Sequence, residues 1–443
     1  MLEKIPINLI FLVSLTLTLT TTGIYGAINP ANGATPISVS QYDKMKNCTQ
    51  NLSKHPTSIE YLTYFNCGHA SSSSNGQTIR DFTLIINENQ KIPISDEGHI
   101  FDGWTFNGTI PGPTMRVTEG DHVRIKVINS PENKHAHSLH LHSIHAAGMD
   151  GVSMGGYPGG AIPPGGSFVY EFNAAPYGVF PYHCHVDPIA DHINRGLYGM
   201  FIIDPKTPRT QMTEFAMLMN GYDLNFDKEG PVGMPTPAEA NADQQAVKPV
   251  VSTDDQQAVK PVVSKGSHDH GKGKTDSGKG KKLNVETSAP TATENASANE
   301  NDGGRDNEIY TVNGKAFQYM THPIPVQAGK PYRIYLVNML EFDLINSFHM
   351  HGTMFNYTIA GTEEKPNYMT DIVTMAQGDR GIIEFQYDYP GKYMFHAHQA
   401  EFTDKGWMGL FDVKPNAVQT TTTAAATTAT DTPSNSVKDL NYS

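Results

Sequence analysis

The chain has 443 residues, of which 38% are hydrophobic, and it carries a formal net charge of −13. That length predicts two or three domains, and the modest hydrophobic share fits β-domains with long polar segments better than one large α/β core. The excess of negative charge argues against nucleic-acid binding.

The N-terminal segment, residues 1–26, has the pattern of a secretory signal peptide. Lys4 precedes an apolar, threonine-containing run from Leu9 to Leu19, and small residues follow it. We therefore expect a secreted or extracytoplasmic protein. Retention of this run as an anchor is the alternative, and it is the one way in which we expect contact with a membrane. Residues 27–77 follow as a polar lead-in.

The chain has three cysteines, and two of them are expected to form a disulfide. Cys48 and Cys67 lie 19 residues apart in the lead-in. In an exported chain a disulfide between them is favoured, with two unpaired thiols as the alternative. The third, Cys184, lies inside a histidine motif.

From residue 78 the chain alternates short apolar runs with glycine and proline. The runs at 82–86, 114–118, 122–128 and 168–172 are typical of strands at the spacing of a β-sandwich or barrel. We assign residues 78–209 to a first β-domain.

A second all-β domain is expected at 210–414, and it repeats features of the first. An Asn-Gly pair lies 33 positions before His140 and another lies 36 before His349. A Glu-Phe pair lies 12 positions before both His183 and His396. The spacing indicates an internal duplication of one β-sandwich.

Two segments have compositions that cannot bury a core. Residues 228–307 are of low complexity and repeat the sequence of 244–252 at 256–264. Residues 415–443 form a tail rich in threonine and alanine. We expect both to be disordered, the first as an insertion in the second domain.

Histidine pairs point to metal binding. Four His-x-His pairs lie in strand-like surroundings, two in each half: His140/His142, His183/His185, His349/His351 and His396/His398. Alternate residues of a strand face the same side, so each pair presents two imidazoles together. Cys184 lies between two of these histidines, and His192 follows a loop later. Thiolate and imidazole together form a copper signature.

These motifs resemble the multicopper oxidases, specifically the two-domain laccase-like members with the blue copper in the N-terminal domain, which are related to the copper nitrite reductases. The segments 106–114 and 308–314 also resemble family segments, and the resemblance covers about 78–227 and 308–414. It implies an all-β fold of two cupredoxin-like Greek-key β-sandwiches.

The resemblance also implies a ligand set of four copper ions per subunit equivalent. The type 1 copper is expected at His137, Cys184 and His192, with Leu197 in the axial position and Met200 as the fallback. The second domain has Ala397 in place of the cysteine, so no blue copper is expected there. The expected ligands of the other ions are His140 and His349 for type 2, and His142, His183, His185, His351, His396 and His398 for type 3.

The implied activity is one-electron oxidation of a donor, coupled at the trinuclear cluster to four-electron reduction of O2. The donor is expected to be phenolic, aromatic or a low-valent metal ion. Asp150 matches a position that assists proton transfer in the family, with a turn residue before Gly151 as the alternative. The family also implies a head-to-tail homotrimer, in which neighbouring subunits share each cluster.

Two other functions stay open. A copper nitrite reductase would use His140, His145, His183 and His192, but Ser143 stands where that family has its catalytic aspartate. It would also leave one histidine of each pair surplus. A secreted copper or electron carrier is the non-enzymatic alternative, although it has no need for eight convergent histidines.

Overall fold

The computed structural model describes residues 48, 56, 58–153, 156–225 and 306–416. The expected signal peptide, nearly all of the expected insertion and nearly all of the tail lie outside these residues. Within the described part of the chain, no helix has the length and apolar character needed to cross a membrane.

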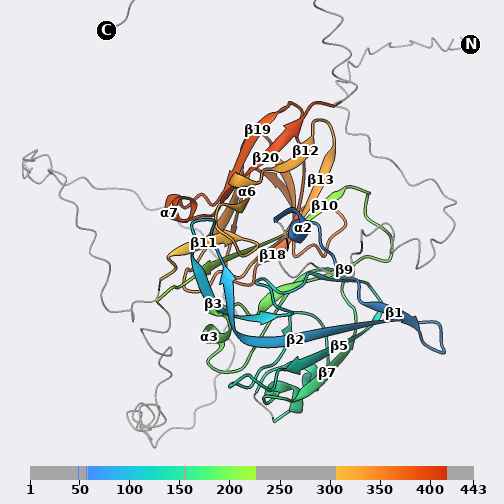
Figure 1. The fold of residues 1–443 in the computed structure, drawn as a ribbon. Helices are drawn as coiled ribbons and strands as arrows, with labels where there is room; N and C mark the ends of the chain where they lie inside the picture. The colour runs from blue at the N-terminus through green and yellow to red at the C-terminus, as the bar shows by residue number, and fades with distance from the viewer. Residues whose placement is uncertain (1–47, 49–55, 57, 154–155, 226–305, 417–443) are drawn as a thin grey trace, which may run out of the picture.

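Residues 69–204 form a first β-sandwich, drawn in blue to green in Figure 1. One sheet has the strand order β1-β2-β5-β7, with β3 also paired to β2, and the other has the order β4-β9-β8-β6. The strands are β1 (His69–Ser72), β2 (Thr78–Pro93), β3 (Ile100–Phe106), β4 (Met115–Thr118), β5 (His122–Asn129), β6 (His140–Leu141), β7 (Ser167–Asn173), β8 (Gly178–His183) and β9 (Tyr198–Asp204). The four apolar runs expected as strands correspond to β2, β4, β5 and β7.

A second β-sandwich, orange to red in Figure 1 apart from its first strand, contains sheets ordered β11-β10-β13-β18-β15-β16 and β12-β20-β19-β14-β17. Its strands are β10 (Thr213–Tyr222), β11 (Ile309–Val312), β12 (Ile324–Gln327), β13 (Pro331–Asn338), β14 (Asn346–Met350), β15 (Phe355–Ile359), β16 (Tyr368–Thr370), β17 (Ile372–Met375), β18 (Arg380–Gln386), β19 (Gly391–His396) and β20 (Met408–Lys414). Short helices are α2 (Ser58–Leu62), α3 (Ile189–Asn194), α6 (Gln318–Thr321) and α7 (Ala400–Asp404), with 3₁₀ turns η1 (Ala147–Met149) and η2 (Pro158–Gly160).

Strand alternation builds the two cores. In β5, Val123, Ile125 and Val127 are buried, whereas Lys126 between them is exposed. This period of two is what a sheet with one face on the core requires. Each sandwich has its own apolar cluster, and a third cluster lies between the sandwiches.

The third cluster joins the two sandwiches through strands that are buried on both faces. On β10, Met217 faces the core of the second sandwich while Ala216 and Leu218 face the interdomain cluster. On β9, Phe201 faces the first core while Met200 faces the interdomain cluster. The two half-molecules are therefore packed together through a continuous apolar layer.

A buried ionic network crosses the same interface. Arg116 Nε donates to Asp204 at 2.8 Å, and its Nη1 donates to Glu214 at 2.6 Å. Arg333 Nη1 donates to Glu214 at 2.9 Å, and the Tyr335 hydroxyl donates to it at 2.7 Å. Each buried charge thus has a partner, as buried charges require.

The lead-in is more ordered than its composition predicts. Cys48 and Cys67 form the expected disulfide, with a Cα–Cα distance of 5.6 Å. Leu62 of α2 is buried in the core of the second sandwich, and Phe65 is buried in the interdomain cluster. The first sandwich also begins before residue 78, because β1 pairs with β2. At the far end of the expected insertion, Asn307 is buried and its amide donates to Glu341 O at 2.6 Å.

Candidate metal centres

The structure brings His137, Cys184 and His192 together at one end of the first sandwich. Cys184 follows β8, His192 lies in α3, and His137 lies in the segment between β5 and β6. Cys184 Sγ lies 3.1 Å from His192 Nδ1 and 3.8 Å from His137 Nδ1, and the two Nδ1 atoms are 3.2 Å apart. One thiol and two imidazole nitrogens therefore converge on one point.

Backbone groups around Cys184 fix the thiol and its neighbour Leu197. Ser138 N lies 3.3 Å from the Cys184 sulfur, and Cys184 N donates to Leu197 O at 2.9 Å. Leu197 is buried in the same core cluster as Cys184. Met200 faces the interdomain cluster instead, because the alternation of β9 turns it away. The geometry thus favours Leu197 at the axial position of the candidate type 1 site. It does not support Met200, the alternative axial residue.

Burial sets the protonation of this group. It lowers the pKa of His137 to about 4 and that of His192 to about 3, so both rings are neutral near pH 7. It raises the pKa of the Cys184 thiol to about 11. Neutral imidazoles are ready to bind a metal ion, and the thiol must lose its proton when one binds.

A second group, the first histidine cluster, consists of His140, His142, His183 and His185. His140 and His183 are paired across β6 and β8, so the two His-x-His pairs lie side by side at the ends of their strands. His142 Nε2 and His183 Nε2 lie 3.1 Å apart, and the rings of His140 and His185 are 5.0 Å apart.

Carbonyl groups orient these rings. His140 Nδ1 lies 2.8 Å from Asp150 O, and His183 Nδ1 lies 2.9 Å from Cys184 O. An Nδ1–H that donates to a carbonyl leaves the Nε2 lone pair for a metal ion. Burial also lowers the pKa of His142 to about 4 and of His183 to about 3, which keeps both rings neutral.

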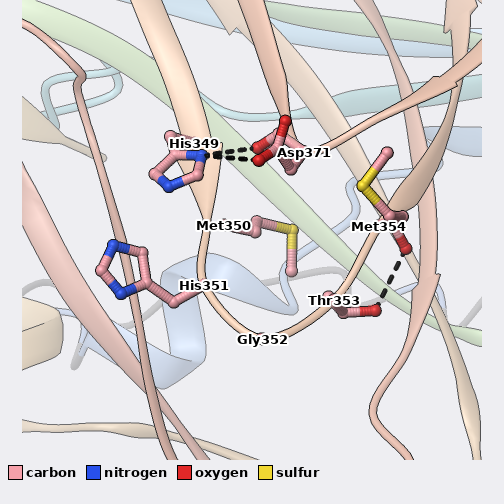
Figure 2. A pocket seen from close by; sticks show the side chains of 7 residues that line it. All are labelled: His349, Met350, His351, Gly352, Thr353, Met354 and Asp371. Atoms are coloured by element: carbon pink, nitrogen blue, oxygen red, sulfur yellow. Dashed lines mark hydrogen bonds and ion pairs between the residues drawn. The ribbon is translucent and has the colours of Figure 1, made fainter.

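The second sandwich repeats this arrangement as the second histidine cluster: His349, His351, His396 and His398. His349 and His396 are paired across β14 and β19. His351 Nε2 and His396 Nε2 lie 3.0 Å apart, and His349 Nδ1 lies 2.8 Å from Asp371 O. His349 and His351 line an open hollow of about 540 Å³. Figure 2 shows the two rings in this hollow, with Asp371 next to His349.

The two clusters do not meet within one chain. Among the described residues, no candidate metal group combines histidines from both sandwiches. The second cluster is open to solvent, since His351 and His398 are both exposed. Large apolar side chains are also exposed next to the motifs, including Leu344 at 92% and Ile144 at 67%. The second cluster and the apolar side chains near both motifs therefore lie at the surface of the molecule.

Asp150 lies beside the first cluster, where the sequence placed it. Its Oδ1 is 3.2 Å from His140 Nδ1 and 3.5 Å from His145 Nε2, so these three residues form another candidate metal group. Gly151 has a φ of +73°, which also fits the turn interpretation. A role in proton transfer and a role as the turn residue before Gly151 are compatible for Asp150.

Three neighbours of the candidate ligands are not marked by any sequence pattern: Glu88, Trp104 and Asp371. Glu88 Oε1 is 3.0 Å from His137 Nε2, and the Trp104 ring lies 5.1 Å from the His137 ring. No motif marks these residues, because each meets its histidine only through the fold.

Comparison with known proteins identifies the family. Two sequence profiles described as multicopper oxidase match residues 88–208 and 284–417. The chain belongs to the multicopper oxidase family. A solved multicopper oxidase structure is 36% identical to it with a TM-score of 0.60, and the match covers 80% of this chain and 95% of that one. The expected fold of two cupredoxin-like β-sandwiches is confirmed.

Curated relatives come from the related reductase branch. The copper-containing nitrite reductase of Neisseria gonorrhoeae is 24% identical over 72% of this chain and 65% of its own length. The enzyme of Alcaligenes faecalis is 32% identical over 31% of this chain and 35% of its own. A solved copper nitrite reductase from Nitrosomonas europaea is 21% identical with a TM-score of 0.52, over 76% of this chain and 94% of that one, which shows a shared fold. The chain thus spans about 65% of the length of the first of these curated relatives.

Proposed function

We propose that this copper oxidoreductase is a laccase-like oxidase. It couples the one-electron oxidation of a small donor to the four-electron reduction of O2 to water. The observation that carries the proposal is the duplicated cluster of four neighbouring histidine rings, together with a free thiol in the first sandwich alone. Bound copper supplies one-electron transfer at the thiolate site and O2 reduction at the histidine site.

The residues of this chain would hold those ions in place. His137, Cys184 and His192 would form the type 1 site, His140 and His349 would bind type 2, and the other six paired histidines would bind the type 3 ions. Cys184 is covalently continuous with His183 and His185. The same tripeptide therefore links the donor side to the cluster without a separate carrier.

The proposed assembly is a head-to-tail homotrimer. Each chain presents two half-clusters that do not meet within it, so a neighbouring copy is needed to complete each one. A heterologous contact that closes makes a ring, and in this ring each chain contributes one half to each of two sites. Exposed Leu344 and Ile144, close to the two motifs, supply apolar surface for that contact.

We also propose that the protein works outside the cytosol. The Cys48–Cys67 disulfide supports this, because disulfides persist in oxidising compartments. The N-terminal segment 1–26, with its signal-like pattern, supports it independently.

Copper nitrite reductase is the second candidate, and two observations favour it. The curated relatives have that activity, and His140, His145 and Asp150 form a further candidate metal group. Against it, Ser143 occupies the position of the family's catalytic aspartate, and His142, His185, His351 and His398 would have no role.

Copper counting combined with two activity assays tests the proposal. The oxidase should bind about four copper ions per chain, and the reductase about two. We expect O2 uptake with a phenol and no production of nitric oxide from nitrite. Two ions per chain with nitrite reduction would establish the reductase instead. Full copper loading with neither activity would favour the carrier.

A further inference from the structure

The candidate type 1 ligands are almost completely buried. His137 is 0% exposed and His192 is 3% exposed. The Trp104 ring packs edge-on against both, with centroid distances of 5.1 and 4.9 Å. Glu88 also contacts His137, with its Oε1 3.0 Å from Nε2. A donor in solution therefore has almost no access to either imidazole.

The side chain of His135 contacts both Trp104 and Glu88 and also reaches solvent. The ring of His135 lies over Trp104, with centroids 4.9 Å apart and planes inclined at 31°. Its Nδ1 is also 3.1 Å from Glu88 Oε2. The side chain of His135 is 54% exposed, so its outer surface is available to a small molecule. Arg195 also lies over Trp104, at 5.1 Å, but it does so as a cation rather than as a ring.

Glu88 is unsuited to capture a metal-ion donor. It is almost fully buried, and its oxygens accept hydrogen bonds from the backbone N–H groups of Lys134 and His135. They are also bonded to the His135 and His137 rings. These bonds occupy the lone pairs of the carboxylate, which a cation would need as ligands. The exposed ring beside it thus fits an organic donor better.

We infer that His135 is the surface residue at which a planar aromatic donor, a phenol or an aromatic amine, delivers its electron. The donor stacks on the outer face of His135, whose inner side contacts the tilted ring of Trp104. The electron reaches the type 1 ligands through Trp104 and the hydrogen-bonded path His135–Glu88–His137. This inference rests on the proposed function and specifies its donor class.

The step balances without another reactant. Each phenol loses one electron towards the type 1 site and releases its hydroxyl proton to water at the exposed surface. Four phenols oxidised to phenoxyl radicals supply the four electrons, and four protons from water complete the reduction of one O2 to two waters.

Binding can be tested on the copper-free protein by tryptophan fluorescence. Trp104 lies under His135, whereas Trp407 is buried in the core of the second sandwich. Titration with 2,6-dimethoxyphenol should quench part of the emission saturably, and His135→Ala should abolish that saturable part. His122→Ala, a partly exposed histidine on β5, is the matched control and should quench like wild type. Equal quenching in His135→Ala and wild type would overturn the inference.

Electron transfer can be tested on the copper-loaded protein by anaerobic stopped-flow bleaching of the blue band. His135→Ala should slow reduction by the phenol roughly tenfold, while His135→Phe, which keeps a ring, should recover most of the rate. The blue spectrum and the type 1 reduction potential should change little in either variant, which separates a donor contact from a structural defect.

The two failures are distinguishable. If the wild-type blue band takes no electron from any phenol or aromatic amine, the proposed donor oxidation fails. If wild type and His135→Ala are reduced equally fast, the inference alone fails. Slowing by Asp102→Asn instead would point to the neighbouring hollow of about 200 Å³ lined by Phe101, Asp102 and Arg195, and would equally overturn the role of His135.

Discussion

The two sandwiches have the same backbone hydrogen bonds around their histidines but differ in the side chains at the position proposed for the type 1 copper. In the first, Cys184 N donates to Leu197 O, and in the second Ala397 N donates to Trp407 O. Ser138 Oγ accepts from His185 N just as Ser347 Oγ accepts from His398 N. The histidine cluster and its backbone support are thus present twice.

The side chains at matching positions explain why only the first copy has a candidate thiolate site. Counted from the paired motifs, His137 corresponds to Asn346 and Cys184 to Ala397. Leu197 N bonds to His192 O, whereas Trp407 N bonds to Phe402 O, so Phe402 occupies the place of His192. The rings of Phe402 and Trp407 are both buried in the core of the second sandwich. The same backbone arrangement therefore carries candidate metal ligands in the first sandwich and apolar core side chains in the second.

The largest predicted effect removes the thiolate from the first copy. Cys184→Ser should abolish the intense blue band and donor oxidation, because no other thiol in the described chain is free to replace it. The histidine clusters should still load, so copper should fall from about four to about three ions per chain. Absorption, EPR and metal analysis measure this. A variant that stays blue would refute the assignment of Cys184.

The next effect concerns the network that joins the two copies. Arg116→Met should leave Asp204 and Glu214 buried without that cation and cost roughly 3–5 kcal/mol of folding stability. Thermal unfolding measures it. Lys91→Met, which removes an exposed ion pair with Asp102, is the matched control and should change stability by less than about 1 kcal/mol. Equal effects of the two substitutions would contradict a structural role for the network.

Acid should weaken the same network. Burial raises the pKa of Glu214, but Arg116 and Arg333 outweigh it, and the pKa lies below its ordinary value of 4.5. Glu214 therefore contributes stability that is present above pH 4.5 and is lost as the pH falls through the lower pKa of the folded state. Melting temperatures of wild type should fall in this acid range. Glu214→Gln should be less stable near neutrality and respond less to acid, and an identical pH profile in both proteins would exclude this contribution.

The smallest effect tests whether a thiol alone restores the missing site. Ala397→Cys should produce no second blue band, because Phe402 and Asn346 supply no imidazole at the matching positions. The added sulfur in a packed core should cost about 1–3 kcal/mol at most. A doubled blue absorbance would show that the second sandwich can form a blue copper site once a thiol is present, and would contradict this difference between the copies.

The histidine pairs could be placed from sequence because strand alternation is local. His140 and His142 need only the pleat of one chain segment to face the same side, and the same holds for the other three pairs. The main strands, the duplication and the disulfide were predictable for similar reasons, since each depends on short-range pattern or on counting.

Contacts that depend on distant parts of the chain could not be predicted. Glu88 meets His137 across 49 positions, and Trp104 reaches the same ring only because β3 is folded against it. The lead-in looked polar on average, yet Leu62 is buried in the core of the second sandwich. The average composition of a segment does not show which of its few apolar residues will be buried by a contact with a distant part of the chain.

Mixing two inactive variants tests most directly that neighbouring chains complete each other's histidine clusters. His140→Ala and His349→Ala should each lack O2 uptake, because each removes one of the two ligands proposed for every type 2 site. Co-assembled, they should regain measurable O2 uptake, since some contacts then join the intact first sandwich of one chain to the intact second sandwich of another. Verified mixed oligomers that bind copper but stay inactive would contradict the account.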